Sequence, residues 1–437
     1  MPEAFREDLF EPDRKELADG PPYRFELDRR EWAGVVVAGL LVTAACKVLT
    51  GQGVAAAEIP PSTRLHLSRD GSITVLTGKV EVGQGSRTEI VQAAAEELRV
   101  APEAVRVMLA DTAVTPDDGS TAGSRTTPST VPVVRRACAA AREMLVRVAQ
   151  EAWNVDASRL QVEAGAVVHN GKRLAYADLA RSMQLNATDD ERTPRGVPLT
   201  KAGDWTVLGR TLLKTAAREI VTGAYRYPSD IVRPGMFYGA VLRPPSYGGE
   251  LESADLRPAK DPGAIAVRDG QFVGCAARTS YAARKAAEEI GKTARWRRAP
   301  HPPSTDLGAY LKSRAQTRGG ERRGPRRRES VDVHFGLATV TTLEASYEIP
   351  YIQGAAVAEW HEGRLTVWTG TQRPFGVREQ LMESFRLADG HARVIVPDTG
   401  GGLGGKHTGE VAVEAARLAR AAGKRVSLRW TRAEEFP

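Results

Sequence analysis

The chain has 437 residues, of which 42% are hydrophobic and 26% are charged. That composition excludes a disordered polypeptide, and the length suffices for two or three domains with cores of their own. The net charge is +7, which by itself favours an acidic or nucleic-acid partner. Much of the excess lies in residues 313–328, where arginines stand among glycine and proline without any aromatic residue. A solvated linker is the better interpretation of that stretch, so we expect no nucleic-acid partner.

The first 58 residues are interpreted as a signal and a linker. Arg29 and Arg30 precede a weakly hydrophobic run at 33–45, a pattern typical of twin-arginine signals, which export proteins already folded around a cofactor. The run is too short to indicate a membrane span, and a buried N-terminal helix is the alternative interpretation. We therefore expect the protein in the periplasm or at the periplasmic face of the inner membrane.

Residues 59–205 are predicted to form an α+β unit. Alternating apolar residues predict strands at 64–68 and 72–77, and longer apolar periods predict helices at 88–99 and 132–153. Asn170 and Gly171 predict a hairpin turn between two further short strands.

Two loops of this unit carry polar groups suited to binding a ligand. Gln84 lies between Gly83 and Gly85, where its amide can offer a donor and an acceptor to a flat heterocycle. Residues 117–128 place hydroxyl groups and backbone donors just before the long helix, as an anion site requires. Each loop by itself is better explained as an ordinary turn.

The second half of the chain is divided at a basic linker, 301–330. Before it, residues 206–300 form a separate predicted unit with a helix at 282–292. After it, residues 331–437 contain predicted strands at 365–368 and 394–396. The last of these strands leads into a glycine-rich turn and a helix at 410–422.

The glycine-rich turn, residues 400–406, has five glycines in its first six positions. Glycines let the backbone approach a bulky anionic group, so this turn predicts a phosphate-containing ligand. It fits the spacing of a nucleotide-triphosphate loop, although His407 replaces the magnesium-binding hydroxyl residue. It also fits a dinucleotide fingerprint, although 423–425 lack the expected acidic residue. A turn without any active-site role is the third interpretation.

The three cysteines, Cys46, Cys138 and Cys275, are far apart in the sequence. Their spacing argues against iron–sulfur ligation and against a disulfide framework within this chain. The histidines are scattered singly, so we predict no metal site built from protein side chains.

Four ordered segments together resemble the molybdopterin-binding large subunits of the xanthine dehydrogenase and aldehyde oxidase superfamily. They are residues 78–85, 121–128, 369–374 and 400–406. The similarity is greatest to the bacterial branch typified by isoquinoline 1-oxidoreductase beta subunits and nicotinate dehydrogenase large subunits. It implies a multi-domain α+β fold, with molybdopterin-binding α+β domains at 59–205 and, in part, at 331–437. Residues 223–245 resemble the start of the family's alpha/beta hammerhead domain, which would occupy 206–300.

The resemblance also implies roles for individual residues. Gln372 would direct its amide at the apical oxygen of molybdenum and is the one catalytic residue expected within this chain. Gln84 would contact the pterin, and Ser124 and Thr126 would bind the phosphate end of the cofactor. The backbone of Leu403 would pass beside the metal, although the family usually has an aromatic residue there. The full set of expected cofactor contacts is Gly83, Gln84, Gly85, Gly123, Ser124, Thr126, Gly402, Leu403, Gly404 and Gly405.

By the same resemblance, the chain is a subunit of a molybdenum-dependent hydroxylase that oxidises aldehydes or N-heteroaromatic compounds with water as the oxygen source. The implied cofactor is molybdenum-molybdopterin in its cytosine dinucleotide form. The implied partners are a small [2Fe-2S] subunit and a cytochrome-type electron acceptor, with an association with the inner membrane. The family's catalytic glutamate would lie beyond Pro437. A catalytically incomplete, cofactor-binding scaffold is therefore the alternative.

Overall fold

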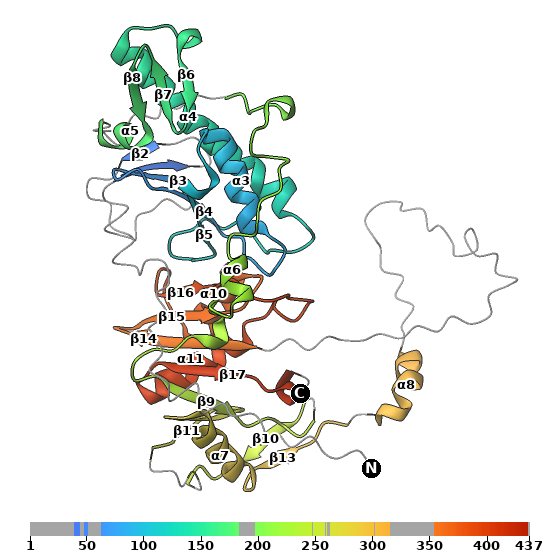
Figure 1. Ribbon diagram of the computed structural model, residues 1–437. Helices are drawn as coiled ribbons and strands as arrows, with labels where there is room; N and C mark the ends of the chain where they lie inside the picture. The colour runs from blue at the N-terminus through green and yellow to red at the C-terminus, as the bar shows by residue number, and fades with distance from the viewer. Residues whose placement is uncertain are drawn as a thin grey trace, which may run out of the picture.

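The computed structural model describes residues 39–43, 48–50, 63–182, 197–246, 248–257, 259, 263–300, 302–314 and 354–435. The chain folds into an elongated stack, with the N-terminal unit at one end and residues 237–297 at the other (Figure 1). The Arg29–Arg30 pair and almost all of the basic stretch 313–328 lie outside the described residues. Within the described residues, no helix is both long and apolar enough to cross a membrane.

The N-terminal unit is a five-stranded sheet covered by two helices. The strand order is β2-β1-β3-β4-β5, and β4 and β5 are parallel because helix α3 connects them. Alanine and leucine side chains of α3 and α4 bury against the sheet, which explains why these predicted helices form as expected. The bounds are β1 Gly39–Thr43, β2 Val48–Thr50, β3 Thr63–Ser68, β4 Ile73–Thr77, β5 Val105–Leu109, α3 Ser86–Leu98 and α4 Val131–Trp153.

The apolar run at 33–45, for which a signal or a buried helix is expected, contributes a strand to this sheet. Strand β1 pairs antiparallel with β3, with Leu41 opposite His66. Glycine, valine and threonine around it favour the extended conformation over a helix. The two strands β1 and β2 therefore lie in the part of the chain predicted to be signal and linker.

A three-stranded meander extends the unit at its far end. It consists of β6 Gln161–Glu163, β7 Ala166–His169 and β8 Lys172–Ala175, followed by helix α5 Tyr176–Ser182. His169 is opposite Lys172, and Asn170 and Gly171 both have positive φ angles. The predicted hairpin turn is confirmed, since that backbone conformation favours asparagine and glycine.

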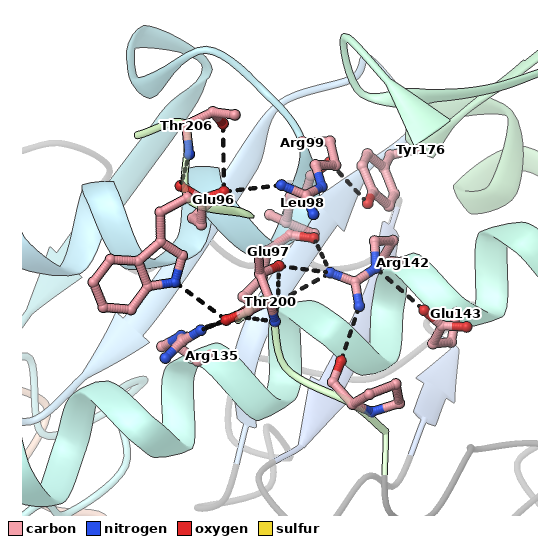
Figure 2. Close-up of polar contacts among 12 residues, drawn as sticks. Glu96, Glu97, Leu98, Arg99, Arg135, Arg142, Glu143, Tyr176, Thr200 and Thr206 are labelled. Carbon is pink, nitrogen blue, oxygen red and sulfur yellow. Dashed lines mark hydrogen bonds and ion pairs between the residues drawn. The ribbon is translucent and has the colours of Figure 1, made fainter. Parts of the chain in front are cut away.

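A strap, residues 197–215, leaves the N-terminal unit along the surface of helix α3. Two adjacent buried carboxylates hold it, as Figure 2 shows. Glu96 accepts hydrogen bonds from the backbone N–H groups of residues 206, 207 and 208 at 2.9, 2.6 and 3.0 Å. Glu97 accepts from the N–H and hydroxyl groups of Thr200 at 3.2 and 3.0 Å. These buried acids are fully satisfied and fix the path of the strap.

The remaining strands form one seven-stranded mixed sheet in the order β11-β12-β9-β17-β14-β15-β16. One sheet thus contains strands from both predicted units, 206–300 and 331–437, because β9 pairs in parallel with β17. The pairing joins residues almost two hundred positions apart, which no local pattern can indicate. The bounds are β9 Phe237–Val241, β11 Ile265–Asp269, β12 Phe272–Ala277, β14 Ala355–His361, β15 Arg364–Thr369, β16 Ala392–Ile395 and β17 Val426–Arg429.

Helices cover both faces of this sheet. Helix α7, Ser280–Gly291, packs on the face that carries Ala240 and Cys275. Helix α11, Glu410–Ala422, packs on the opposite face, where Leu418 lies against Gly239 and Gly274. Helix α10, Pro374–Phe385, packs against β16 and beside α11. Outside these layers are the strand pair β10 Glu250–Ser253 and β13 Arg295–Arg297, and the helices α6 Ala217–Val221 and α8 Leu307–Arg314.

The buried histidine of β3 predicts a pH dependence of stability. The His66 side chain is fully buried, and burial lowers its pKa from the usual 6.5 to about 4. The unfolded chain therefore binds a proton between these pH values while the folded chain does not. We expect the free energy of unfolding to fall by about 3 kcal/mol as the pH decreases from 7 to 4.

Urea unfolding at pH 7 and pH 4.5 tests this expectation. The variant His66→Leu should lose less stability on acidification than the parent chain. The variant His361→Gln, at an exposed position, should behave like the parent. An identical acid response in His66→Leu and the parent would contradict the assignment.

Candidate cofactor site

The glycine-rich turn lies where the N-terminal unit meets the mixed sheet. Backbone hydrogen bonds connect the segment after β5 to β16: Thr112 N–H to Val394 O at 3.0 Å, and Val396 N–H to Ala110 O at 3.0 Å. The guanidinium of Arg393 also forms a two-pronged ion pair with the buried carboxylate of Asp111. The loops from both units are therefore held in a fixed relation before any ligand binds.

Gln372 lies at the centre of this junction, between strand β15 and helix α10. Its backbone N–H donates to Lys406 O at 2.7 Å, and its backbone carbonyl accepts from Thr121 N–H at 2.9 Å. Its side-chain Nε2 donates to Thr121 O at 2.6 Å. The amide carries two hydrogens, so one N–H is left for a ligand. Its Oε1 is buried without a hydrogen-bond partner among the described residues.

The glycine-rich turn packs directly against that amide. A Cβ atom added to Gly402 would overlap Oε1 and Cδ of Gln372, so only glycine lets the turn lie this close. The next residue, Leu403, has a φ of 43° and a side chain that is 71% exposed. Gly404 follows with a φ of 96° and open space at the position that a Cβ atom would take. The turn thus presents bare backbone and one exposed aliphatic side chain to solvent.

The structure decides against both nucleotide interpretations of the turn. The Lys406 ammonium donates to Thr399 Oγ1 at 2.6 Å and to Gly400 O at 3.0 Å, so it stabilises its own loop instead of reaching outward. Burial lowers the pKa of that ammonium. The sheet is mixed, with β14 and β15 antiparallel, whereas a dinucleotide fold needs parallel strands. The predicted strand, turn and helix order is confirmed.

The Gln84 loop reaches the same junction from the N-terminal unit. Gly83 and Gly85 have φ angles of 103° and 92°, which explains the glycines on both sides of Gln84. The exposed Gln84 side chain turns back on its own loop, where Nε2 donates to Val80 O at 3.0 Å and to Ser86 Oγ at 2.7 Å. Both amide hydrogens of Gln84 are therefore used in hydrogen bonds within its own loop.

The loop at 117–128 lies next to Gln372, through Thr121. Lys79 holds it by donating to Asp118 O at 2.7 Å and to Ser120 O at 2.9 Å. Beyond Thr121, Gly123 and Ser124 are exposed and both have positive φ angles. Thr126 is buried at the start of a single irregular turn, Thr126–Thr130, which leads into α4.

The structure therefore connects all three loops at one junction between the two units, through the contacts of Glu81, Thr121 and Gln372. It also adds residues that sequence reasoning missed. Arg87 donates to both carboxylate oxygens of Asp398 at 3.2 and 2.6 Å, and Glu81 accepts a backbone hydrogen bond from Thr399 at 2.9 Å. The alternation of charged residues and valines at 79–82 gives no direct signal that Glu81 is buried.

The groups around the junction suit a large, polar, phosphorylated ligand. They comprise backbone at the loop tips, the orphaned buried oxygen and remaining N–H of Gln372, and a turn at Gly402 that tolerates no side chain. No cluster of three or more histidine, cysteine, aspartate or glutamate side chains that could bind a metal occurs in the described ranges. The groups at the junction fit a cofactor that is held through backbone and amide contacts.

Comparisons with known proteins identify the ligand class. Residues 28–227 match one family model described as a molybdopterin cofactor-binding domain, and residues 335–437 match a second of the same description. The chain belongs to the molybdopterin-binding subunits of the xanthine dehydrogenase family. The expected resemblance is confirmed, and with it a molybdenum-molybdopterin cofactor.

Two curated relatives extend over most of this molybdopterin-binding chain. A nicotinate dehydrogenase subunit of Pseudomonas putida is 30% identical over 397 residues, which cover 85% of the chain and 32% of that relative. The beta subunit of isoquinoline 1-oxidoreductase from Brevundimonas diminuta is 26% identical over 435 residues, which cover 87% of the chain and 55% of that relative. The chain thus spans between about a third and about half of the length of these relatives.

Solved structures give a weaker match. Quinoline 2-oxidoreductase from Pseudomonas putida 86 aligns with a TM-score of 0.37 and 22% sequence identity, over 52% of this chain and 35% of that one. The helices and mixed sheets of the chain itself are consistent with the predicted α+β class.

Proposed function

We propose that this chain is the cofactor-binding part of a molybdenum hydroxylase that oxidises aldehydes or N-heteroaromatic rings with oxygen from water. The observation that supports the proposal most is the junction of Gln372, Thr121 and Gly402, because it joins segments from both matched domains. When bound, the cofactor supplies a molybdenum centre that accepts two electrons from the substrate. The cytosine dinucleotide form remains part of the proposal.

The chain's own residues would hold and orient that cofactor. The remaining Nε2–H of Gln372 would donate a hydrogen bond to an oxygen of the cofactor, and the bond to Thr121 keeps the amide in place. The bare backbone at Gly402 to Gly404 would allow close approach, while the exposed Leu403 side chain would exclude water on one side. Ser124 and Thr126 would face the phosphate end. No proton acceptor for the reaction is assigned to a described residue.

Electrons would leave through a partner protein, for which we propose a small [2Fe-2S] subunit and a cytochrome-type acceptor. The described cysteines do not suit a redox relay, because Cys138 and Cys275 are both buried. Burial raises the pKa of Cys275 to about 12, so its thiol stays protonated. The relatives are named as subunits, which supports a multi-subunit complex.

Turnover of substrate tests the proposed function. We expect the 437 residues alone to give no sustained dye-linked oxidation of aromatic aldehydes or N-heterocycles. Activity should appear when the polypeptide corresponding to the remaining length of the relatives and an iron–sulfur subunit are added. Sustained activity of the isolated 437 residues would contradict the need for these added polypeptides. A molybdenum-loaded complex that is inactive on every such substrate would contradict the reaction class.

Two finer assignments belong to the same proposal. We propose that residues 206–300, with β9 to β13 and α7, correspond to the family's hammerhead domain. We also propose periplasmic location or association with the periplasmic face of the inner membrane, from the Arg29–Arg30 pair. Replacing both arginines by lysine should retain the protein in the cytoplasm, and an unchanged periplasmic yield would contradict this.

A further inference from the structure

Glu81 occupies a position where an anionic ligand would otherwise be expected. Helix α3 begins at Ser86 without a side-chain cap from its N-cap residue, Gly85. Its first N–H groups therefore have no acceptor within the helix, and they lie at the positive end of the helix dipole. A phosphate commonly binds at such a helix end. Here the carboxylate of Glu81, which is 4% exposed, lies there instead.

The carboxylate of Glu81 accepts backbone hydrogen bonds from the first turn of the helix and from the loop before it. Its Oε1 accepts the backbone N–H groups of Gly83 and Gly85, both at 2.9 Å. Its Oε2 accepts the backbone N–H of Arg87 at 3.0 Å. A single buried carboxylate therefore binds three donors on both sides of Gln84, and these N–H groups are not available to a ligand.

Two further contacts connect Glu81 to the strap and to the opposite domain. Lys214 on the strap places its Nζ 3.5 Å from Glu81 Oε1 and donates to Gly83 O at 2.8 Å. The backbone carbonyl of Glu81 accepts from Thr399, the residue just before the glycine-rich turn. Glu81 thus joins the Gln84 loop, the strap and the second cofactor loop.

We propose that Glu81 is a positioning residue which shapes the Gln84 loop for the cofactor and, as an internal anion, excludes phosphate from the start of α3. The phosphate end of the cofactor is thereby directed to the loop that contains Gly123, Ser124 and Thr126, of which Gly123 and Ser124 are exposed. The second half of this inference rests on the proposed function, whereas the exclusion of phosphate does not.

Inorganic phosphate added to cofactor-free protein tests the exclusion directly. Removal of the carboxylate in Glu81→Ala should expose three N–H groups beside Lys214. We expect a saturable, phosphate-dependent rise in melting temperature that exceeds the rise in the parent chain. The control Glu89→Ala removes the same charge from the first turn of α3 and should respond like the parent. A folded Glu81→Ala variant with no extra response to phosphate would overturn the exclusion.

Cofactor retention tests the positioning role, with a variant that preserves the side-chain shape. Glu81→Gln keeps the volume but loses the charge, and its amide nitrogen cannot accept a hydrogen bond. Because charge-assisted hydrogen bonds contribute about a factor of ten or more each, we expect roughly tenfold less pterin per chain, measured by fluorescence after oxidation. Glu81→Asp should recover part of the loss, and Glu89→Gln should show none.

The two experiments separate failure of this inference from failure of the proposed function. A parent chain without molybdenum or pterin would contradict the proposed function but leave the phosphate result intact. A loaded parent chain with normal pterin in folded Glu81→Gln would overturn the positioning role alone.

Discussion

Replacing Glu97 by glutamine is expected to destabilise the N-terminal unit by about 3 to 5 kcal/mol, because removal of one partner of a buried ion pair leaves the other charge buried without its counter-ion. Glu97 is fully buried and faces two arginines, Arg135 at 2.7 Å and Arg142 at 2.9 Å. Removal of its charge leaves both guanidinium groups without their main counter-ion, and it weakens the attachment of the strap at Thr200.

Hydrogen exchange of peptides from α3 across a urea titration measures this effect locally, which suits a chain of several domains. The matched control is Glu143→Gln. Glu143 also accepts from Arg142, at 3.2 Å, but its side chain is 35% exposed, so its loss should cost about 1 kcal/mol or less. Equal losses in the two variants would show that burial of Glu97 does not decide its contribution.

Replacing Gly402 by alanine is expected to remove most of the bound molybdenum while the protein stays folded. The added methyl group would overlap the Gln372 amide, which must then move and give up its hydrogen bond to Thr121. Loss of this buried hydrogen bond, together with displacement of the loop beside it, should lower cofactor occupancy by about tenfold or more. Metal analysis of the purified variant gives the occupancy.

Two other glycines of the same turn provide the comparison. Gly400 has open space at its Cβ position, so Gly400→Ala should keep the cofactor. Gly404 also has open space but a φ of 96°, so Gly404→Val should lose the cofactor through backbone strain, because β-branched residues disfavour that conformation. Full molybdenum occupancy in Gly402→Ala or in Gly404→Val would contradict the role of the turn.

Local patterns in the sequence predicted the elements that carry the site. The strand, glycine turn and helix around residues 400–406 and the helices after Gln84 and Ser124 all follow from periodicity and glycine placement, which depend on neighbouring residues only. The hydrogen bonds of the site's side chains could not be predicted from periodicity and glycine placement. The Gln84 amide was expected to face a heterocycle, yet it bonds to Val80 and Ser86 because those partners lie within the same short loop.

Contacts between segments that lie far apart in the chain could not be predicted from local sequence patterns. The parallel pairing of β9 with β17 and the close approach of Gly402 to Gln372 depend on how distant segments pack. The buried acids Glu81, Glu96 and Glu97 were missed for another reason. A charged residue is usually solvated. The alanine-rich helix around Glu96 and Glu97 was a signal of burial, whereas Glu81 lies in the loop before α3.

Cofactor binding by these loops is decided by the molybdenum and pterin content of the purified chain, produced in a host that makes the cofactor. We predict molybdenum and pterin in equal amounts, approaching the amount of protein in the parent and in Gly400→Ala, and strongly reduced in Gly402→Ala. A folded parent chain that contains neither molybdenum nor pterin under these conditions would contradict the assignment of this junction as the cofactor site.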